Sequence, residues 1–239
     1  MPPVNNQEPA LAIIPARGGS KRIPKKNIKE FAGLPIIAWS IKAAQASKQF
    51  SRIMVSTDCP QIAAVARSYG AEVPFLRSEA NSSDVSPVAD ALLEVLEDYA
   101  RRGQDFAVAC CLHATAPFIL PQDLMQGRQA LEAGGYDTMM PVAAFDYPIW
   151  RSLKRDNAGR LALNFPENLN KRSQDLPTAY HDAGQWYWFR TDALKRDRAF
   201  LGPNTGSIIL SSVQVQDIDT EADWALAELK HQHLFGESC

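Results

Sequence analysis

The stretch LAIIPARGGSKRIPKKN, residues 11–27, decides the fold. Its first five residues form a short apolar run, which predicts a buried β-strand. The segment that follows the run contains two adjacent glycines and is strongly basic. We therefore expect a flexible, cationic loop to leave the end of a strand that lies in the core of the protein.

Strands and helices alternate along the chain after this stretch. This alternation predicts an α/β fold, with a mostly parallel, doubly wound sheet and helices on both of its faces. Ligands of such sheets bind at the carboxyl ends of the strands, where the basic loop would lie. The expected strands span residues 52–56, 73–76, 106–112 and 138–142, and the expected helices span residues 34–45, 61–69, 86–102 and 120–133.

The alternation stops over residues 145–180, which are aromatic, charged and contain prolines. We interpret this segment as an irregular excursion from the core. Beyond it we expect strands at residues 185–189, 208–210 and 213–218, followed by a final helix at residues 220–234. No internal repeat or linker divides the sequence. It therefore predicts one domain over residues 11–239, after a disordered tail of residues 1–10.

The composition limits the classes of partner. The chain has 239 residues, 25 Lys and Arg against 27 Asp and Glu, and a formal net charge of -2. A balance this close to neutrality gives no electrostatic reason to expect nucleic acid or a membrane as a partner. No signal peptide and no membrane-spanning run is recognised. The four cysteines contain no CxxC pair, which indicates reduced thiols and a cytoplasmic location.

The basic loop has the composition of an anion site. Gly18 and Gly19 allow backbone N–H groups to converge on an anion, and cationic side chains add charge-assisted contacts to phosphate oxygens. The loop matches neither the GxxxxGK[ST] nor the GxGxxG pattern. Triphosphate binding is favoured over a solvated basic turn or a nucleic-acid patch. The cations of the loop are Arg17, Lys21, Arg22, Lys25, Lys26 and Lys29.

The pattern IPARGGSKRIPKKNIK, residues 14–29, resembles the signature of the acylneuraminate cytidylyltransferase family, and the resemblance extends from residue 11 to about residue 234. It implies a Rossmann-like fold of the nucleotide-diphospho-sugar transferase type and CTP as a substrate. It also implies that Arg17 and Lys26 contact the triphosphate and that Asn27 faces the nucleotide. Gly18, Gly19 and Ser20 join this predicted site. Arg77, in a segment similar to the nucleoside loop of the family, is expected to reach the cytosine.

Asp217 and Asp219 are the candidate metal ligands. On a strand, residues i and i+2 project to the same side, so both carboxylates would face one cation. Mg²⁺ prefers one or two carboxylates together with phosphate oxygens and water. The alternative is a solvent-facing strand end, in which Asp219 or Thr220 caps the following helix. A similar acidic pair in the family favours Mg²⁺. Asp58 is expected to cap a helix.

The segment after the central strand, His113-Ala114-Thr115-Ala116-Pro117, departs from the Gln-Pro-Thr-Ser-Pro of sialic-acid-activating members. It resembles the branch of the family that activates pseudaminic acid, whereas N-acetylneuraminic and legionaminic acids are the alternative substrates. We predict that His113, Asp182 and Gln185 contact this acidic nine-carbon sugar. His231 and His233 are interpreted as a surface pair.

No activated nucleophile is recognised, which favours direct attack of the sugar hydroxyl on the α-phosphorus of CTP with release of pyrophosphate. Arg17, Lys26 and Mg²⁺ held by Asp217 and Asp219 would stabilise the developing charge. The resemblance also implies that the excursion mediates a homodimer. A CTP-binding protein without catalysis is the remaining alternative.

Overall fold

The strand predicted from the opening stretch, β1 (Ala10–Pro15), lies inside a seven-stranded sheet. This computed structural model describes residues 8–83 and 86–236; residues 1–7 of the expected tail lie outside them, and β1 begins one residue before the expected start. Strands β4 (Arg52–Ser56) and β5 (Val108–Leu112) flank β1 in parallel. The apolar run around β5 therefore forms a central strand, as predicted.

The other half of the sheet contains the exceptions to parallel pairing. Strand β10 (Trp186–Arg190) runs antiparallel between β5 and β6 (Thr138–Ala144), and β11 (Thr205–Ile209) is parallel to β6 at the edge. The short β9 (Tyr180–Asp182) also pairs with β6 in the antiparallel sense. The order is β11-β6-β10-β5-β1-β4. The sheet is thus mostly parallel, and the reversed β10 brings the residues before it to the carboxyl ends of β1, β4 and β5.

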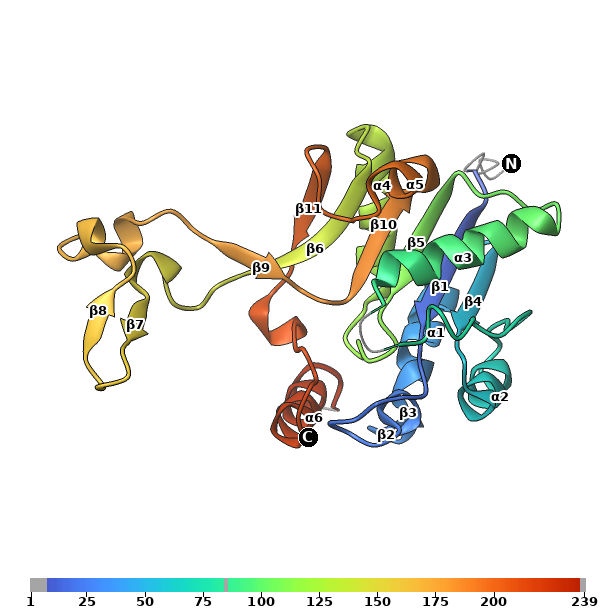
Figure 1. Ribbon diagram of the computed structural model, residues 1–239, viewed down its shortest axis with the longest axis horizontal. Helices are drawn as coiled ribbons and strands as arrows, with labels where there is room; N and C mark the ends of the chain where they lie inside the picture. Colours follow the sequence, from blue (N-terminus) through green and yellow to red (C-terminus); the bar gives the residue numbers. More distant parts are fainter. Residues whose placement is uncertain (1–7, 84–85, 237–239) are drawn as a thin grey trace.

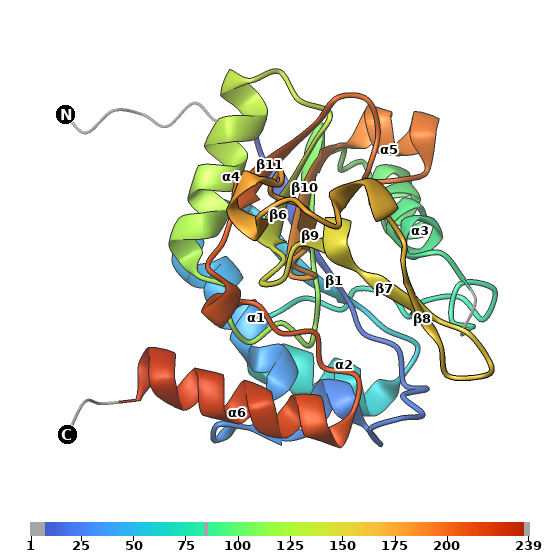
Figure 2. The ribbon, with the colours of Figure 1, turned by 90° about the vertical axis from the view of Figure 1, so that its left-hand side faces the viewer.

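Helices cover both faces of the sheet, which confirms the doubly wound α/β prediction (Figure 1 and Figure 2). Helices α1 (Ile36–Ser47), α2 (Pro60–Ser68) and α4 (Pro121–Ala133) pack into one core cluster. Helices α3 (Val88–Arg101) and α5 (Thr191–Asp197) pack into the other. Adjacent Cys110 and Cys111 point into opposite clusters, as alternation along a strand requires.

A third, smaller cluster holds the C-terminal helix against the basic loop. Helix α6 (Glu221–Phe235) buries Trp224 and Ala227 against Phe31 of the short hairpin β2 (Glu30–Phe31) and β3 (Leu34–Pro35). Thr220 and Asp223 form a capping box that fixes the first turn of α6. Figure 2 shows α6 lying beside this hairpin, below the sheet. The alternative in which Thr220 caps the helix is therefore confirmed.

The excursion projects from the body of the protein. It contains the 3-10 turns η2 (Ile149–Arg151), η3 (Pro166–Asn168) and η4 (Ser173–Asp175) and the hairpin of β7 (Leu153–Arg155) and β8 (Leu161–Leu163). Figure 1 shows this hairpin well outside the sheet. Large apolar side chains remain exposed on it, among them Leu153 at 57% and Leu161 at 63%. The expectation of an irregular segment outside the core agrees with this arrangement.

Two expected strands are absent from the described residues. Residues 73–76 form no strand, and the preceding Glu72 makes only an isolated bridge to Met54. Residues 213–218 begin within the 3-10 turn η5 (Ser212–Gln214) and continue as an unpaired segment. Side chains bind the carbonyls that a ladder would otherwise use: Gln185 donates to Gln214 O and Lys230 to Val215 O. No described helix has the length and apolar character that crossing a membrane requires.

Candidate active site

Two cavities lie next to each other at the edge of the sheet where β1, β4 and β5 end. We call the first the loop cavity; its volume is about 350 Å³. We call the second the strand-end cavity; its volume is about 750 Å³. His113, the residue directly after β5, lines both. The loop cavity is further lined by Arg17, Ser20, Lys21, Arg22, Lys26, Asn27 and Arg77, and the strand-end cavity by Asp146, His181, Asp182, Tyr187, Asp217 and Lys230.

The glycine loop is held in place by two side chains. Asp58, just after β4, accepts a hydrogen bond from Gly18 N at 2.8 Å. Buried Asn27 donates from Nδ2 to Arg17 O at 2.9 Å. A Cβ at Gly18 would lie 3.0 Å from Cys59 Cβ, whereas one at Gly19 would meet nothing within 4 Å. Gly18 thus permits close packing on the start of α2, and Gly19 leaves the backbone open to an anion.

The role of Asp58 differs from the one expected. Helix α2 has Cys59 at its N-cap and no side-chain capping bond, so the prediction that Asp58 caps a helix is wrong. The carboxylate turns instead to the loop after β1, because β1 and β4 are parallel neighbours whose carboxyl ends lie side by side. The sequence could have indicated this contact only if the strand order had been known, because that order places the ends of β1 and β4 side by side.

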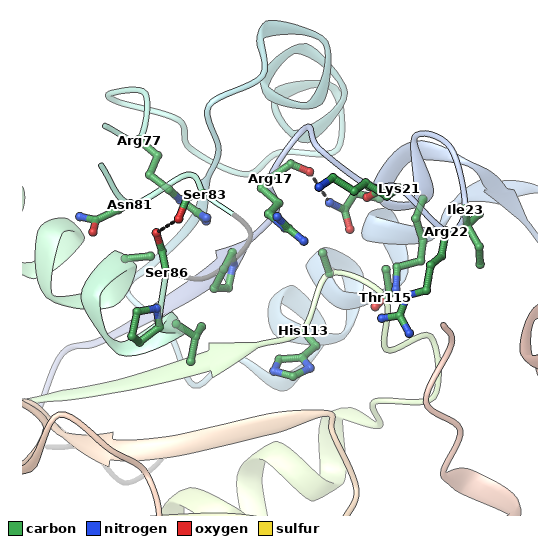
Figure 3. A pocket seen from close by; sticks show the side chains of 18 residues that line it. Arg17, Lys21, Arg22, Ile23, Arg77, Asn81, Ser83, Ser86, His113 and Thr115 are labelled. Carbon is green, nitrogen blue, oxygen red and sulfur yellow. Dashed lines mark hydrogen bonds between the residues drawn. The ribbon is translucent and has the colours of Figure 1, made fainter. Parts of the chain in front are cut away.

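Four of the loop cations, Arg17, Lys21, Arg22 and Lys26, line the loop cavity. Figure 3 shows Arg17, Lys21 and Arg22 around it. Lys26 Nζ donates to Ile218 O at 2.6 Å and lies 3.4 Å from Asp219 Oδ1. Arg22 Nη2 forms a 2.7 Å ion pair with the same oxygen of Asp219. The loop is therefore docked onto the segment before α6 by charge, and the predicted contributors Arg17, Ser20, Lys26 and Asn27 all line one cavity.

Asp217 and Asp219 are not arranged as expected. Because residues 215–220 form no strand, the rule that places residues i and i+2 on one side does not apply. Asp219 is bound to Arg22 and Lys26, whereas Asp217 lines the strand-end cavity. The prediction that both carboxylates face one cation from a strand is therefore wrong in its geometry. Thr220 caps α6, which is one of the two caps that the competing interpretation named, whereas the strand end that it placed before the helix is absent from the described residues.

The described residues contain no group of three or more His, Cys, Asp or Glu side chains that could hold a metal ion. A nucleotide-bound Mg²⁺ does not need such a cluster, because phosphate oxygens and water supply most of its ligands. The exposed Asp217 carboxylate fits that requirement as a single protein ligand. Asp219 would first have to leave its ion pairs with Arg22 and Lys26.

Arg77 is anchored at the far side of the loop cavity. Its Nε donates to Ser56 Oγ at 3.0 Å and its Nη2 to Ser56 O at 2.6 Å. Burial lowers the pKa of the Arg77 guanidinium, and the carboxylates of Asp58 and Glu94 oppose this shift. The guanidinium nevertheless remains a cation at neutral pH, since an arginine in a protein does not lose its proton. Arg77 thus adds a fixed charge where the sequence predicts a nucleoside contact.

The sequence analysis did not name the polar side chains next to Arg77 as site residues, although Ser83 and Ser86 belong to the segment that resembles the nucleoside loop of the family. Asn81, Ser83 and Ser86 line the same cavity, and Figure 3 shows them beside Arg77. The Glu94 carboxylate, on α3, accepts hydrogen bonds from Ser78 and Asn81 and holds this turn in place. Although partial burial raises the pKa of Glu94, these hydrogen bonds lower it overall. Serine and asparagine in a loop carry no distinctive pattern, so only their position reveals them.

His113 and Asp182 meet at the strand-end cavity as predicted. Tyr187 Oη donates to Asp182 Oδ2 at 2.7 Å, and Gly184 N donates to Asp182 Oδ1 at 2.8 Å. The His113 ring lies 5.4 Å from the Tyr187 ring. Burial lowers the pKa of His113, against the opposing effect of Asp182 and Asp217. His113 is therefore neutral at pH 7 and able both to donate and to accept a hydrogen bond.

Gln185 does not share this position. It is buried, with 2% of its surface exposed, and among the described residues it lines neither cavity. Its side-chain Nε2 donates to Gln214 O at 2.7 Å, and its backbone carbonyl oxygen accepts from His113 N at 2.8 Å. The predicted sugar contact is not what the structure shows: Gln185 positions the backbone of His113 and the turn after β11.

His231 also departs from its expected place. Its ring packs against Phe31 at 5.4 Å and Trp39 at 4.6 Å, between α6 and the hairpin, and its Nε2 atom is buried without a hydrogen-bond partner. The interpretation of His231 and His233 as a surface pair is wrong for His231. Only His233, at an exposed position near the end of α6, agrees with it. His231 follows Trp224 by seven residues, so the two side chains lie on the same face of a helix. This spacing could have predicted that His231 belongs to the apolar stripe of α6.

Known proteins resemble this chain over nearly its whole length. Residues 11–222 match the cytidylyltransferase family. A pseudaminic acid cytidylyltransferase of Campylobacter jejuni is 36% identical over 222 residues, which are 93% of this chain and 96% of that protein. A CMP-N,N'-diacetyllegionaminic acid synthase of Legionella pneumophila is 35% identical over 91% of this chain and 94% of its own length.

Among solved structures, a CMP:2-keto-3-deoxy-manno-octonic acid synthetase complexed with CTP superposes with a TM-score of 0.69. It covers 95% of this chain and 98% of its own, with 17% sequence identity, so it supports the fold alone. The fold is that of the nucleotide-diphospho-sugar transferases, as predicted. By sequence, the chain belongs to the cytidylyltransferase family.

Proposed function

We propose that this enzyme transfers the cytidylyl group of CTP to pseudaminic acid, giving CMP-pseudaminic acid and pyrophosphate. Two similar proteins of Campylobacter jejuni, 36% and 34% identical to this chain, carry the name pseudaminic acid cytidylyltransferase. The Ala114-Thr115-Ala116-Pro117 sequence after His113 supports the same choice of sugar.

The position of His113 between the two cavities carries the proposal. The loop cavity is lined by cations and suits a triphosphate. The strand-end cavity is lined by carboxylates, aromatic rings and other polar groups, which suits a polyhydroxylated sugar with amide substituents. Because His113 lines both, the α-phosphate of CTP and the anomeric hydroxyl of the sugar would meet beside it.

In the proposed reaction, the anomeric hydroxyl of the sugar gives up its proton to solvent and its oxygen forms the new bond to the α-phosphorus. The bond from the α-phosphorus to the oxygen that bridges to the β-phosphate breaks, and pyrophosphate leaves. Arg17 and Lys26 stabilise the charge that develops on the departing pyrophosphate. To do so, the Lys26 ammonium exchanges Ile218 O and Asp219 for phosphate oxygens. Arg77, with Ser83 and Ser86 beside it, is proposed to contact the cytosine. The open backbone at Gly19 would then lie against the triphosphate.

We include Mg²⁺ in the proposal, with Asp217 as its protein ligand and Asp219 as a second ligand only if it leaves Arg22 and Lys26. When bound, the ion would neutralise charge on the phosphate oxygens. Asp217 lines the strand-end cavity that His113 joins to the loop cavity, so its exposed carboxylate lies near the proposed meeting point of the two substrates. Loss of turnover in EDTA, restored by added Mg²⁺, is the expected result.

A cytoplasmic homodimer of one-domain subunits, without nucleic acid or membrane as a partner, completes the proposal. The projecting excursion supports dimerisation, because Leu153, Leu161 and Leu169 would remain in water on an isolated subunit. Cys59, Cys110 and Cys111 are free thiols, which suits a reducing compartment. A monomeric mass by light scattering at micromolar concentration would contradict the dimer.

Pyrophosphate release tests the function. The purified protein is supplied with CTP, Mg²⁺ and, in separate reactions, pseudaminic, legionaminic or N-acetylneuraminic acid, with a reaction lacking sugar as the control. Release with pseudaminic acid alone is the expected result. Release with legionaminic acid alone would instead favour the activity named for the Legionella relative. CTP binding without release in any reaction would indicate a protein that binds CTP without catalysis.

His113 offers a test of the choice of sugar. Glutamine stands at this position in the Gln-Pro-Thr-Ser-Pro motif of sialic-acid-activating members, from which this sequence departs, and both side chains can donate and accept hydrogen bonds. We expect the His113→Gln variant to lose turnover of pseudaminic acid by a larger factor than it changes the KM for CTP. An equal effect on both substrates would place His113 outside the recognition of the sugar.

A further inference from the structure

Lys230 is the one lysine or arginine among the described residues that line the strand-end cavity. It comes from α6, three residues after the buried Ala227, and lies at the edge of the inward-facing stripe of this helix, where it reaches the wall of the cavity. A half-buried lysine there indicates a use for its charge beyond solubility.

The ammonium group is held in a fixed position. Its Nζ donates to Val215 O at 2.7 Å and to Ser212 O at 3.2 Å, and both of these residues also line the cavity. A lysine ammonium has three N–H donors, so two are engaged and one is left for a ligand. Burial lowers the pKa of Lys230, and the carboxylate of Asp146 opposes that shift.

The rest of the cavity is unfavourable to an anion. Asp146, Asp182 and Asp217 place three carboxylates on its wall. An acidic sugar brings a further carboxylate, and like charges in one partly buried site repel. The loop cations Arg22 and Lys26 contact Asp219 and line the other cavity. The cavity therefore needs a cation of its own to bind an acidic sugar, and α6 supplies it.

We propose that Lys230 binds the carboxylate of the sugar substrate and selects acidic over neutral sugars. This proposal rests on the proposed function, since it concerns the sugar of that same reaction. Asp182, held by Tyr187 and Gly184, would then face hydroxyl or amide donors, so that opposite ends of the sugar meet opposite charges. Sugar recognition thereby depends on α6, although α6 lies outside the sheet.

A purely structural role for Lys230 makes a different prediction. If the ammonium only ties α6 to the turn η5, its removal loosens this contact and affects every substrate alike. If it binds the carboxylate, its removal affects only a substrate that carries one. The two roles are separated by comparing the free sugar acid with its methyl ester, which keeps the ring, the hydroxyls and the amides but has no charge.

The experiment measures pyrophosphate release by wild type, Lys230→Met and Lys230→Arg with pseudaminic acid and with its methyl ester, at saturating CTP. Lys42→Met, which removes an exposed lysine of α1 that lines neither cavity, is the control for loss of charge. We expect Lys230→Met to raise the KM for the acid by about 10- to 100-fold, as loss of a charge-assisted hydrogen bond predicts. The KM for the ester and the KM for CTP should change by less than about twofold, which is within the spread for an uninvolved group.

Lys230→Arg keeps the charge and is expected to restore part of the preference for the acid. A preference that is the same in Lys230→Met as in wild type would overturn the proposal, even with both activities reduced. Failure of wild type to use any of the nine-carbon acids would overturn the proposed function as well. Melting temperatures of all variants, measured without substrate, show whether α6 remains docked.

Discussion

Asp58 provides the sharpest test of how the glycine loop is organised. Its carboxylate accepts the N–H of Gly18 at 2.8 Å, and the sequence predicts this amide as a phosphate ligand. Two outcomes follow from one contact. If Asp58 fixes the loop in the conformation that binds CTP, Asp58→Ala weakens binding; if Asp58 competes with phosphate for the amide, Asp58→Ala strengthens it.

We predict weakening. Gly19, Ser20 and Arg17 lie on the loop that Asp58 fixes, and a disordered loop would have to be ordered again when the triphosphate binds. A hydrogen bond to a charged group contributes about 1.5–3 kcal/mol, and partial exposure of Asp58 places it at the low end. A loss of about 1.5 kcal/mol corresponds to a roughly tenfold rise in the Kd for CTP.

Isothermal titration with CTP and Mg²⁺ measures the effect directly. Asp58→Asn keeps an oxygen that can accept from Gly18 and is expected to lose less affinity than Asp58→Ala. Glu97→Ala, which removes an exposed carboxylate from α3, controls for the change in net charge. CTP binding by Asp58→Ala that is as tight as wild type, or tighter, would refute the role of Asp58 in positioning the loop.

Further predictions concern stability and catalysis. A Cβ at Gly127 in α4 would lie 2.6 Å from the Trp186 ring, so overpacking costs about 1–3 kcal/mol, of which the better helix propensity of alanine offsets about 1 kcal/mol. Gly127→Ala should therefore lower the Tm by about 3 °C. Gly202→Ala, whose Cβ would meet nothing within 4 Å, should leave the Tm unchanged. Burial lowers the pKa of His231 below 6.5, so the folded state takes up a proton less readily than the unfolded chain. The contribution of the neutral His231 to the free energy of unfolding is therefore complete above pH 6.5 and is lost as the pH falls below it. The Tm of His231→Leu should therefore fall less between pH 7 and pH 5 than that of wild type, whereas equal slopes would contradict this. Arg17→Ala should reduce turnover by about 100- to 1000-fold with an unchanged circular dichroism spectrum, and near-normal turnover would exclude Arg17 from the triphosphate site.

The parts of the fold that depend on neighbouring residues in the chain could be predicted. Strand β1 and the loop after it are specified by an apolar run followed by Gly18, Gly19 and a series of cations, and the structure brings Arg17 and Lys26 to one cavity. The same holds for α6, whose start is encoded in Thr220 and Asp223. Each of these signals lies within one turn or one strand, so no knowledge of the tertiary structure is needed.

The parts that depend on distant partners could not. Asp217 and Asp219 were assigned to a strand because the sequence alternates there, but Lys26, Gln185 and Lys230 bind the carbonyls of this region from three other parts of the chain. Side chains thus take the place of a neighbouring strand, and the two carboxylates turn to different surroundings. A pattern of alternation cannot report whether a strand is available to pair with.

The reversed direction of β10 explains why the strand-end rule accounts for only half of the candidate sugar site, whereas Asp182 was predicted from the resemblance to the family. The rule that ligands bind at the carboxyl ends of strands leads to His113 after β5 but not to Asp182 and Gly184, which precede β10. Because β10 runs antiparallel to β5, its beginning lies at the same edge as the end of β5, and Tyr187 in its second position reaches back to hold Asp182. The consequence is a division of the edge: parallel strands β4, β1 and β5 supply the cationic cavity, while the start of β10 and the end of β6 supply the acidic one. One reversed strand therefore separates two cavities of opposite charge, and His113 lies where they join.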